Sequence, residues 1–233
     1  MSDVQVEDAT ADRWDDVVAV MEGPGDPGRC WCQWFYRGGQ ADSEHAAANR
    51  EALCGQVREG PPPGVLGYVD GVPSGWAAVA ARPGYTRLTN GQLLRGTEGL
   101  EDPAIWAVTC FVVRRPARRS GLSSTLLAGA VDLARRGGAR EVEGYPVDLA
   151  VRGRTSAAEL YHGPLSVFLR TGFSEVARPQ PARPVVRLRL GDQPTSSREA
   201  SQSRAAASGS SAWSATPVPV PSRCGSASLQ SSK

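Results

Sequence analysis

The segment 110–136 constrains the fold of this chain more than any other. It reads CFVVRRPARRSGLSSTLLAGAVDLARR. The apolar run 110–113 predicts a short buried strand, and Pro116 marks the turn after it because proline cannot donate to a strand ladder. From Leu122 onward, apolar residues recur at helical spacing until a pair of glycines ends the pattern. The segment therefore predicts a strand, an arginine-rich turn and a long amphipathic helix.

The start of this helix is a favourable place for a negatively charged ligand. Gly121 has no side chain, so a ligand oxygen can approach the backbone closely. The first amides of a helix lack intrahelical acceptors, and the helix dipole favours negative charge beside them. Arginines at 114, 115, 118 and 119 surround the turn, and guanidinium groups pair well with phosphate oxygens. The sequence predicts a phosphate-bearing ligand here, with an ordinary turn carrying surface arginines as the alternative.

The turn residues resemble a known motif. The run Arg118-Arg119-Ser120-Gly121-Leu122-Ser123 resembles the acyl-CoA-binding motif of the GNAT acetyltransferase superfamily, with Ser123 where the family prefers glycine or alanine. The run 168–173, an aromatic residue four positions before Gly-Phe, resembles a second signature of that family. Cys30-Trp31-Cys32, together with Gly144-Tyr145-Pro146-Val147 and Tyr161-His162-Gly163, resembles one GNAT subgroup.

This resemblance implies an α/β (α+β) fold in which helices flank a mixed, mostly antiparallel sheet with splayed central strands. The predicted elements follow the same order along the chain: a strand and helix in 4–21, a helix in 43–58, a hairpin around 70–71, strands at 105–113 and 141–147, a helix through 160–168, and a last strand pair in 175–190. We expect a GNAT domain over 3–190. The Ser-, Ala- and Pro-rich segment 191–233 is expected to be a disordered tail.

The resemblance also implies acetyl-CoA as cosubstrate. In this family the central strand splays from its neighbour, so its free amides hold the pantetheine arm and polarise the thioester carbonyl. The turn that follows holds the pyrophosphate. Carried over by position, the cofactor-binding residues are Phe111, Val112, Val113, Arg118, Arg119, Ser120, Gly121, Leu122 and Ser123.

Two residues are candidates for catalysis. An acceptor amine must lose a proton, and Glu143, on the strand beside the splay, is the expected base; the alternative is an exposed strand carboxylate. Many relatives protonate the leaving thiolate with a tyrosine at the position that Phe168 occupies here. Tyr161 is therefore the expected substitute acid. Ser166 or solvent could take the role instead, because coenzyme A is a fairly good leaving group.

The cysteines point to small hydrophobic side chains and not to a metal site. The five cysteines are irregularly spaced, which favours a reducing compartment. Cys30, Cys32, His45 and Cys54 do not follow a recurring zinc-ligand pattern, so no metal is expected. Cys30 and Cys32 are expected to border the acceptor pocket beside neighbouring tryptophans. Cys110, in the middle of a strand, is expected to be inert core.

Charge and hydropathy exclude other classes of partner. The 233 residues carry a net charge of only +2, and Lys233 is the single lysine. Nucleic-acid binding normally needs a clear basic excess on one face, so no nucleic-acid partner is expected. No stretch approaches the ~20 apolar residues of a membrane span, and the acidic start does not resemble a signal peptide. A cytoplasmic location is expected.

The function implied by the resemblance is transfer of an acetyl group from acetyl-CoA to a primary amine by direct attack. The aromatic cluster within 31–36 could form a compact apolar wall, which favours a small molecule as acceptor. A non-catalytic acyl-CoA-binding regulatory module and a protein N-acetyltransferase are the alternatives. The expected partners are acetyl-CoA and an amine, and the sequence leaves open whether the chain forms a homodimer.

Overall fold

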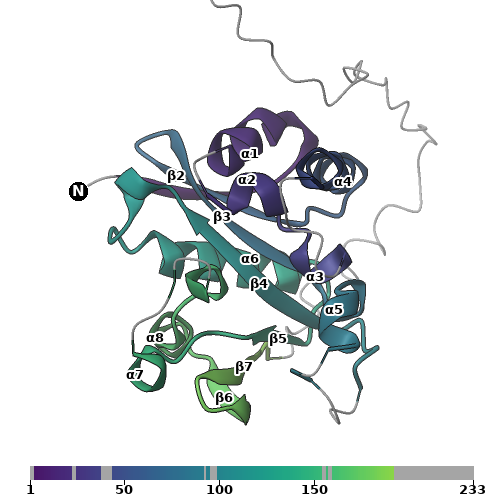
Figure 1. The fold of residues 1–233 in the computed structure, drawn as a ribbon, viewed down its shortest axis with the longest axis vertical. Helices are drawn as coiled ribbons and strands as arrows, with labels where there is room; N and C mark the ends of the chain where they lie inside the picture. Colours follow the sequence, from purple (N-terminus) through teal and green to yellow (C-terminus); the bar gives the residue numbers. More distant parts are fainter. Residues whose placement is uncertain are drawn as a thin grey trace, which may run out of the picture. The chain divides into compact units, whose positions relative to one another are not determined.

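One mixed sheet organises the part of the chain that the structure describes (Figure 1). The computed structural model describes residues 3–22, 25–37, 44–91, 93–94, 99–153, 156 and 159–191. Its strands are β1 (Val4–Asp8), β2 (Gly64–Val69), β3 (Val72–Ala81), β4 (Ile105–Val113), β5 (Glu141–Gly144), β6 (Ser174–Gln180) and β7 (Arg183–Arg189). Their order is β1-β2-β3-β4-β5-β7-β6, and every neighbouring pair is antiparallel except β4 and β5. The predicted mixed, mostly antiparallel sheet is confirmed.

Helices flank this sheet, as predicted. The α-helices are α1 (Trp14–Met21), α2 (Pro27–Cys30), α3 (Trp34–Arg37), α4 (Ala46–Glu59), α5 (Thr86–Thr89), α6 (Leu122–Arg136), α7 (Leu149–Arg152) and α8 (Leu165–Arg170). The short 3-10 helices are η1 (Ala11–Arg13), η2 (Arg82–Gly84), η3 (Arg115–Ala117) and η4 (Glu159–His162). The strand 105–113 and the helix that begins at Leu122 are confirmed. The tail predicted for 191–233 lies, apart from Gly191, outside the described residues, and the domain limits stay a prediction.

Two predicted elements differ from the structure. The helix predicted through 160–168 is two pieces, η4 and α8, because Gly163 takes a left-handed φ of 76° and Pro164 then precedes the new helix. Glycine adopts such a φ readily, and proline cannot continue a helix that already needs its amide. The strand predicted over 141–147 ends at Gly144, because pairing with β4 stops there.

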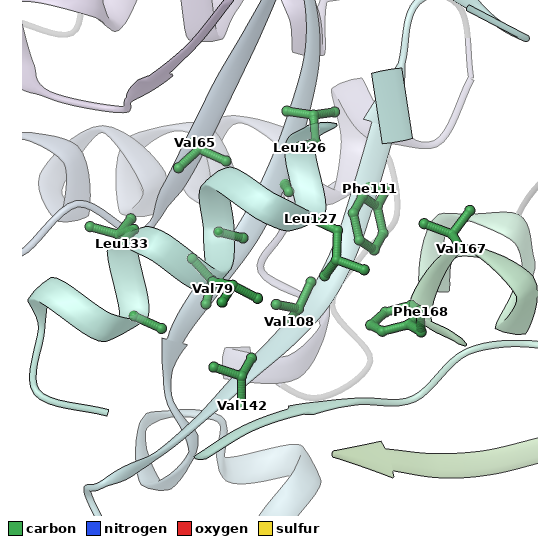
Figure 2. Close-up of a cluster of buried hydrophobic side chains, with 14 of the residues drawn as sticks. Val65, Val79, Val108, Phe111, Leu126, Leu127, Leu133, Val142, Val167 and Phe168 are labelled. Carbon is green, nitrogen blue, oxygen red and sulfur yellow. The ribbon is translucent and has the colours of Figure 1, made fainter. Parts of the chain in front are cut away.

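The main core lies between the sheet and helices α6 and α8. Figure 2 shows Leu126 and Leu127 of α6 among valines from neighbouring strands. The labelled partners from the sheet and α8 are Val65, Val79, Val108, Phe111, Val142, Val167 and Phe168. The predicted apolar stripe of α6 is thus its buried face, at the helical spacing that the sequence indicates.

A second, aromatic cluster occupies the other side of the central strands. Phe35 from α3 and Tyr85 from the segment after η2 pack with Tyr145, which follows β5. The rings of Phe35 and Tyr85 meet edge to face, with centroids 6.3 Å apart. Ala107 of β4 belongs to this cluster, whereas its neighbours Trp106 and Val108 belong to the core under α6. Alternation along β4 therefore separates the two layers.

Gly144 lets α8 close over the end of the β4–β5 pairing. A Cβ at Gly144 would lie 2.8 Å from both Cδ1 and Cζ of Phe168 and closer still to Cε1. The ring of Phe168 is fully buried and meets the rings of Phe111 and Phe173 edge to face. Only a residue without a side chain can therefore occupy this position while Phe168 keeps its place.

We expect Gly144→Ala to lower the free energy of unfolding by roughly 1–3 kcal/mol, because the added methyl overpacks the site of Phe168. The measurement is a urea unfolding curve. Gly55→Ala in α4 is the matched control, since a Cβ there meets nothing within 4 Å. That change should be neutral or stabilise by up to about 1 kcal/mol. Equal effects of the two substitutions would contradict the packing described for Phe168.

Candidate active site

The turn between β4 and α6 presents a row of free backbone donors. Within the described residues, the amides of 119–123 make no hydrogen bond. The first amide to find a partner is that of Ser124, which donates to the carbonyl of Gly121 at 2.9 Å. Arg119 and Gly121 both have left-handed φ, 68° and 86°, which turns successive amides toward one side. This is the geometry that an anion-binding turn requires.

The space in front of the turn is open. A Cβ placed on Gly121 would meet nothing within 4 Å, so this position borders empty space. Ser120 ties the turn together, since its hydroxyl donates to the carbonyl of Ala117 at 2.7 Å. Arg118 lies beside the turn, where its Nε donates to the carbonyl of Val113 at 3.2 Å. The predicted turn residues thus supply outward amides and positive charge together.

The central strands separate immediately before this turn. The parallel pairing of β4 with β5 ends at Val108 and Gly144. Beyond that point no described strand pairs with 109–113 on the β5 side. The splay expected between the central strands is therefore present, and the backbone of β4 faces a gap there.

A β-bulge decides which side chains face the gap. The pairing of β3 with β4 skips Thr109, because Val79 pairs with Val108 and Ala78 with Cys110. A bulge shifts the alternation of a strand by one residue. As a result Cys110 and Val112 line a cavity, whereas Phe111 belongs to the core under α6. The side chain of Val113 packs against the same core. Of the three predicted strand contacts, only Val112 also offers its side chain to the cavity.

A cavity of about 810 Å³ occupies the gap. It is bounded by α2, α3, β4, α7, η4 and the turn between β6 and β7. The residues that line it are Asp26, Pro27, Cys30, Cys32, Trp34, Phe35, Thr109, Cys110, Val112, Val151, Arg152, Glu159, Tyr161, His162, Gln180, Pro181, Ala182 and Arg183. It therefore joins the unpaired half of β4 to a wall of aromatic and charged side chains.

His162 is a neutral imidazole in this wall. Its Nδ1 lies 3.2 Å from the carbonyl oxygen of Thr109. A carbonyl can only accept, so Nδ1 carries the proton and Nε2 keeps a free lone pair. The ring packs edge to face on Phe35 with centroids 5.5 Å apart. Burial, with a smaller effect of the nearby guanidinium of Arg183, lowers the pKa of His162 from 6.5 to about 4. Sequence analysis missed this residue, although it follows the predicted Tyr161.

Tyr161 offers a hydroxyl donor in the same cavity. Within the described residues its hydroxyl makes no hydrogen bond, and a Cβ on Gly25 would lie 3.8 Å from it. Burial first, and then the charge of Asp26, raises the pKa of Tyr161 above its ordinary value. The hydroxyl therefore stays protonated at neutral pH.

Glu143 does not line the cavity. Its carboxylate is fully buried and forms an ion pair with Arg82 at 3.0 Å, where both side chains have 0% exposure. Arg187 binds the other oxygen, with Nε at 3.1 Å and Nη2 also in contact. The hydroxyl of Tyr145 donates to Glu143 at 2.8 Å. Three residues thus donate four hydrogen bonds to this carboxylate, which favours a role in holding the strands together. The base role stays a prediction that this placement does not favour.

Three thiols also meet in the cavity. Cys30, Cys32 and Cys110 are free and line it, so the predicted place of Cys30 and Cys32 at the pocket is confirmed. Cys110 is a lining residue and not inert core, because the bulge turns it outward. A hydrogen bond to Cys110, followed by burial, raises the pKa of Cys32 well above its ordinary value, and burial raises that of Cys30 to about 11. Cys30 and Cys32 therefore stay protonated at neutral pH and act as small apolar groups. Cys54 is disulfide-bonded, which departs from the free thiols that its spacing predicts.

The described residues hold neither a metal cluster nor a membrane helix. No group of three or more His, Cys, Asp or Glu side chains among them is arranged to hold a metal ion. Likewise, none of their helices combines the length and apolarity needed to cross a bilayer.

Comparison with known proteins decides the family. The sequence pattern of the acetyltransferase (GNAT) family matches residues 29–161, more than half of the chain. The chain belongs to this family. It is an acetyl-CoA-dependent acetyltransferase, and the matched region contains the splayed strand, the turn and Tyr161.

Solved structures resemble this acetyltransferase at low identity. A putative acetyltransferase, yncA from Salmonella typhimurium with acetyl-CoA, is 15% identical, covers 82% of this chain and 95% of its own, and has a TM-score of 0.47. PaiA N-acetyltransferase from Thermoplasma acidophilum with coenzyme A is 10% identical, covers 81% and 99%, and has a TM-score of 0.44. Diaminobutyrate acetyltransferase EctA from Paenibacillus lautus, with its substrate and coenzyme A, is 12% identical, covers 83% and 100%, and has a TM-score of 0.47. Among curated proteins, no sequence matches this chain.

Gly121→Val should abolish the thermal stabilisation by coenzyme A, because its side chain would fill the space in front of the free amides. The matched control is Gly138→Val at the other end of α6. Gly138 has the same left-handed φ, 85° against 86°, and equally open space. Both variants should lose similar stability from backbone strain, roughly 1–3 kcal/mol. The turn assignment fails if Gly121→Val keeps the wild-type shift of melting temperature with coenzyme A.

Proposed function

We propose that this acetyltransferase moves an acetyl group from acetyl-CoA to the primary amine of a small molecule by direct attack within the cavity. The observation that supports this most strongly is that one cavity joins the unpaired half of β4, the neutral His162 and the unpartnered hydroxyl of Tyr161. The cavity is bounded by six elements and has a volume of about 810 Å³, the scale of a small-molecule site. An extended protein surface would need a shallower opening.

The turn residues would hold the cosubstrate. The outward amides of 119–123 and the guanidinium groups of Arg118 and Arg119 would bind the diphosphate, because they combine free donors with positive charge. The backbone of Phe111, Val112 and Val113 would accompany the pantetheine arm along the gap. Acetyl-CoA, when bound, supplies a thioester whose carbonyl carbon an amine can attack.

His162 is the group that we assign as the proton acceptor. Its Nδ1–H is held by the carbonyl of Thr109, so the lone pair on Nε2 is fixed in direction. An imidazole with a pKa of about 4 cannot deprotonate a free ammonium ion to any useful extent. It can take the proton once the amine nitrogen begins to bond carbon, because that nitrogen then becomes acidic. The amine must therefore already be deprotonated when it enters the cavity from solution.

Tyr161 would supply the proton that the departing sulfur needs. Its hydroxyl remains protonated at neutral pH and has no competing partner among the described residues. Phe168, at the position where many relatives carry the acid, is buried in the core beneath α6. In this proposal the proton donor is Tyr161 in the short η4 helix before Gly163, and not a residue at the position of Phe168 in α8 after it.

His162→Asn should lower kcat by roughly 100- to 10,000-fold, because asparagine can still donate to Thr109 but offers no imidazole lone pair. Stabilisation by coenzyme A should not change. His45→Asn is the matched control at the other histidine of the chain, outside the cavity.

In the wild type, kcat at saturating neutral amine should stay level from pH 8 down to about 5, because the lowered pKa keeps His162 unprotonated. An enzyme whose histidine had the ordinary pKa would lose activity below pH 6.5.

The rival base is tested in the same assay. Glu143→Gln should mainly destabilise the protein, by about 3–5 kcal/mol, since it leaves two guanidinium groups beside a neutral amide. If the folded Glu143→Gln protein binds coenzyme A but loses turnover, while His162→Asn stays active, Glu143 is the base and His162 is not.

Tyr161→Phe should lower kcat by about tenfold, with little change in KM for acetyl-CoA, because a thiolate of fairly low pKa leaves even without a placed acid. The deficit should shrink when an acetyl thioester of a more acidic thiol replaces acetyl-CoA. Tyr68→Phe is the control, since the Tyr68 hydroxyl binds Asp16 and not the cavity. A Tyr161→Phe enzyme with full activity would assign the proton to water.

The proposed acetyl transfer has its own contrary outcome. If the wild-type chain binds coenzyme A but acetylates no amine, the chain is a binding module.

A further inference from the structure

Arg183 is a cavity residue that the mechanism above does not use. It is the first residue of β7 and follows the tight turn at Pro181 and Ala182. The carbonyl of Ala182 accepts a hydrogen bond from the amide of Asp148 at 2.9 Å, which fixes this turn beside the segment after β5. Arg178 braces the same turn, since it binds both Asp148 and the carbonyl of Pro181. Arg183 is therefore presented to the cavity from a rigid support.

The guanidinium of Arg183 has no partner among the described residues. It is half-buried, yet it makes no ion pair and no hydrogen bond there. Burial accordingly lowers the pKa of Arg183 from its ordinary value. A partly desolvated cation with five unused donors is costly unless an anion joins it.

The other arginines nearby are satisfied. Arg152, in the same cavity wall, binds Glu159 with an Nη2 to Oε1 distance of 2.8 Å. On the same strand, Arg187 binds Glu141 and Glu143, and Arg189 lies 3.4 Å from Glu141. Arg183 thus differs from these arginines, because its guanidinium has no ion-pair partner among the described residues. Its five unused N–H donors point to a ligand.

The anion that Arg183 could bind belongs to the acceptor and not to coenzyme A. The phosphate-binding donors lie at the turn 119–123, and none of these residues lines the cavity. Arg183 lines the cavity together with His162, and its charge acts on that imidazole. An amine that reaches His162 therefore has its remaining groups within the neighbourhood of Arg183.

The chemistry favours a carboxylate over a phosphate. One planar guanidinium matches one carboxylate through two parallel hydrogen bonds. A dianionic phosphate would call for a second cation, and the charge of Arg152 is already neutralised by Glu159. We propose that the acceptor is an amine that also carries a carboxylate, an amino acid or a close relative of one, and that Arg183 binds this carboxylate while the amine reaches His162. This rests on the proposed function of the cavity.

Binding is measured separately from turnover. Protein saturated with coenzyme A is titrated calorimetrically with a panel of the common amino acids, their carboxamides and the corresponding decarboxylated amines. At least one amino acid should bind, and its carboxamide should bind at least about 30-fold more weakly, as expected when a partly buried guanidinium loses its partner. Arg183→Ala should bring the amino acid down to the affinity of its carboxamide.

Arg189→Ala is the matched control, because Arg189 lies on the same strand with 86% of its side chain exposed. It should keep the full difference between acid and carboxamide. Arg183→Ala should melt no lower than wild type, since it removes an unpaired, half-buried charge, and Arg183→Lys should recover only part of the affinity because lysine lacks the planar fork.

The outcomes separate this proposal from the general function. The Arg183 proposal is overturned if no amino acid binds, if acid and carboxamide bind equally, if the difference survives in Arg183→Ala, or if that variant loses stabilisation by coenzyme A. Turnover of simple amines without such a difference would leave the acetyl transfer standing. An Arg183-dependent preference for the acid without any acetylation would keep the carboxylate site and remove the catalytic role.

Discussion

The buried carboxylate of Glu143 joins three strands at the level where the sheet divides. Glu143 lies on β5, Arg82 directly follows β3, and Arg187 lies on β7. One residue beyond Glu143, the last pair between β4 and β5 forms at Gly144. A buried charge is expensive unless its partners are close and well aligned, and here two guanidinium groups and a phenol surround it. The paired part of β4 and β5, up to Val108 and Gly144, is thereby fixed, so the chain beyond these residues can diverge without loss of register.

The bulge at Thr109 and the ring of Phe168 then shape the two sides of the gap. The bulge moves Cys110 and Val112 toward the cavity and leaves Phe111 in the core. Phe168 packs on Phe111 and over Gly144, so it seals the gap from the side of α6. The cavity therefore lies beside the unpaired half of β4, where α2, α3 and the β6–β7 turn supply its walls.

Local patterns predicted the parts of the fold that local forces determine. The strand 105–113, the turn and the helix from Leu122 follow from β-branched residues, glycine and helical spacing, and the structure has them at those positions. The free amides of 119–123 follow in the same way, since every helix start leaves amides unpaired. The break between η4 and α8 could also have been predicted, because Gly163 and Pro164 together interrupt helices. The helical spacing of the apolar residues around this pair favoured one continuous helix instead.

The cavity residues depend on contacts that no local pattern contains. Glu143 is predicted as a base from its strand position, yet its partner Arg82 is 61 residues away and Arg187 is 44 residues away. His162 becomes a candidate only when the fold brings it to Thr109, 53 residues earlier. The bulge turns Cys110 to the cavity where inert core was expected, since simple alternation cannot reveal an extra residue. Arg183 likewise becomes a candidate only because its guanidinium makes no ion pair or hydrogen bond with the described residues.

The short η4 helix carries Tyr161 and His162 as consecutive residues, and the left-handed Gly163 after them detaches this turn from α8. Both side chains line the cavity, and the hydrogen bond between Nδ1 of His162 and the carbonyl of Thr109 holds this short helix against β4. The proposed proton donor and proton acceptor are therefore neighbours in the chain. Any displacement of this helix would move both groups together, so their positions in the cavity are not independent.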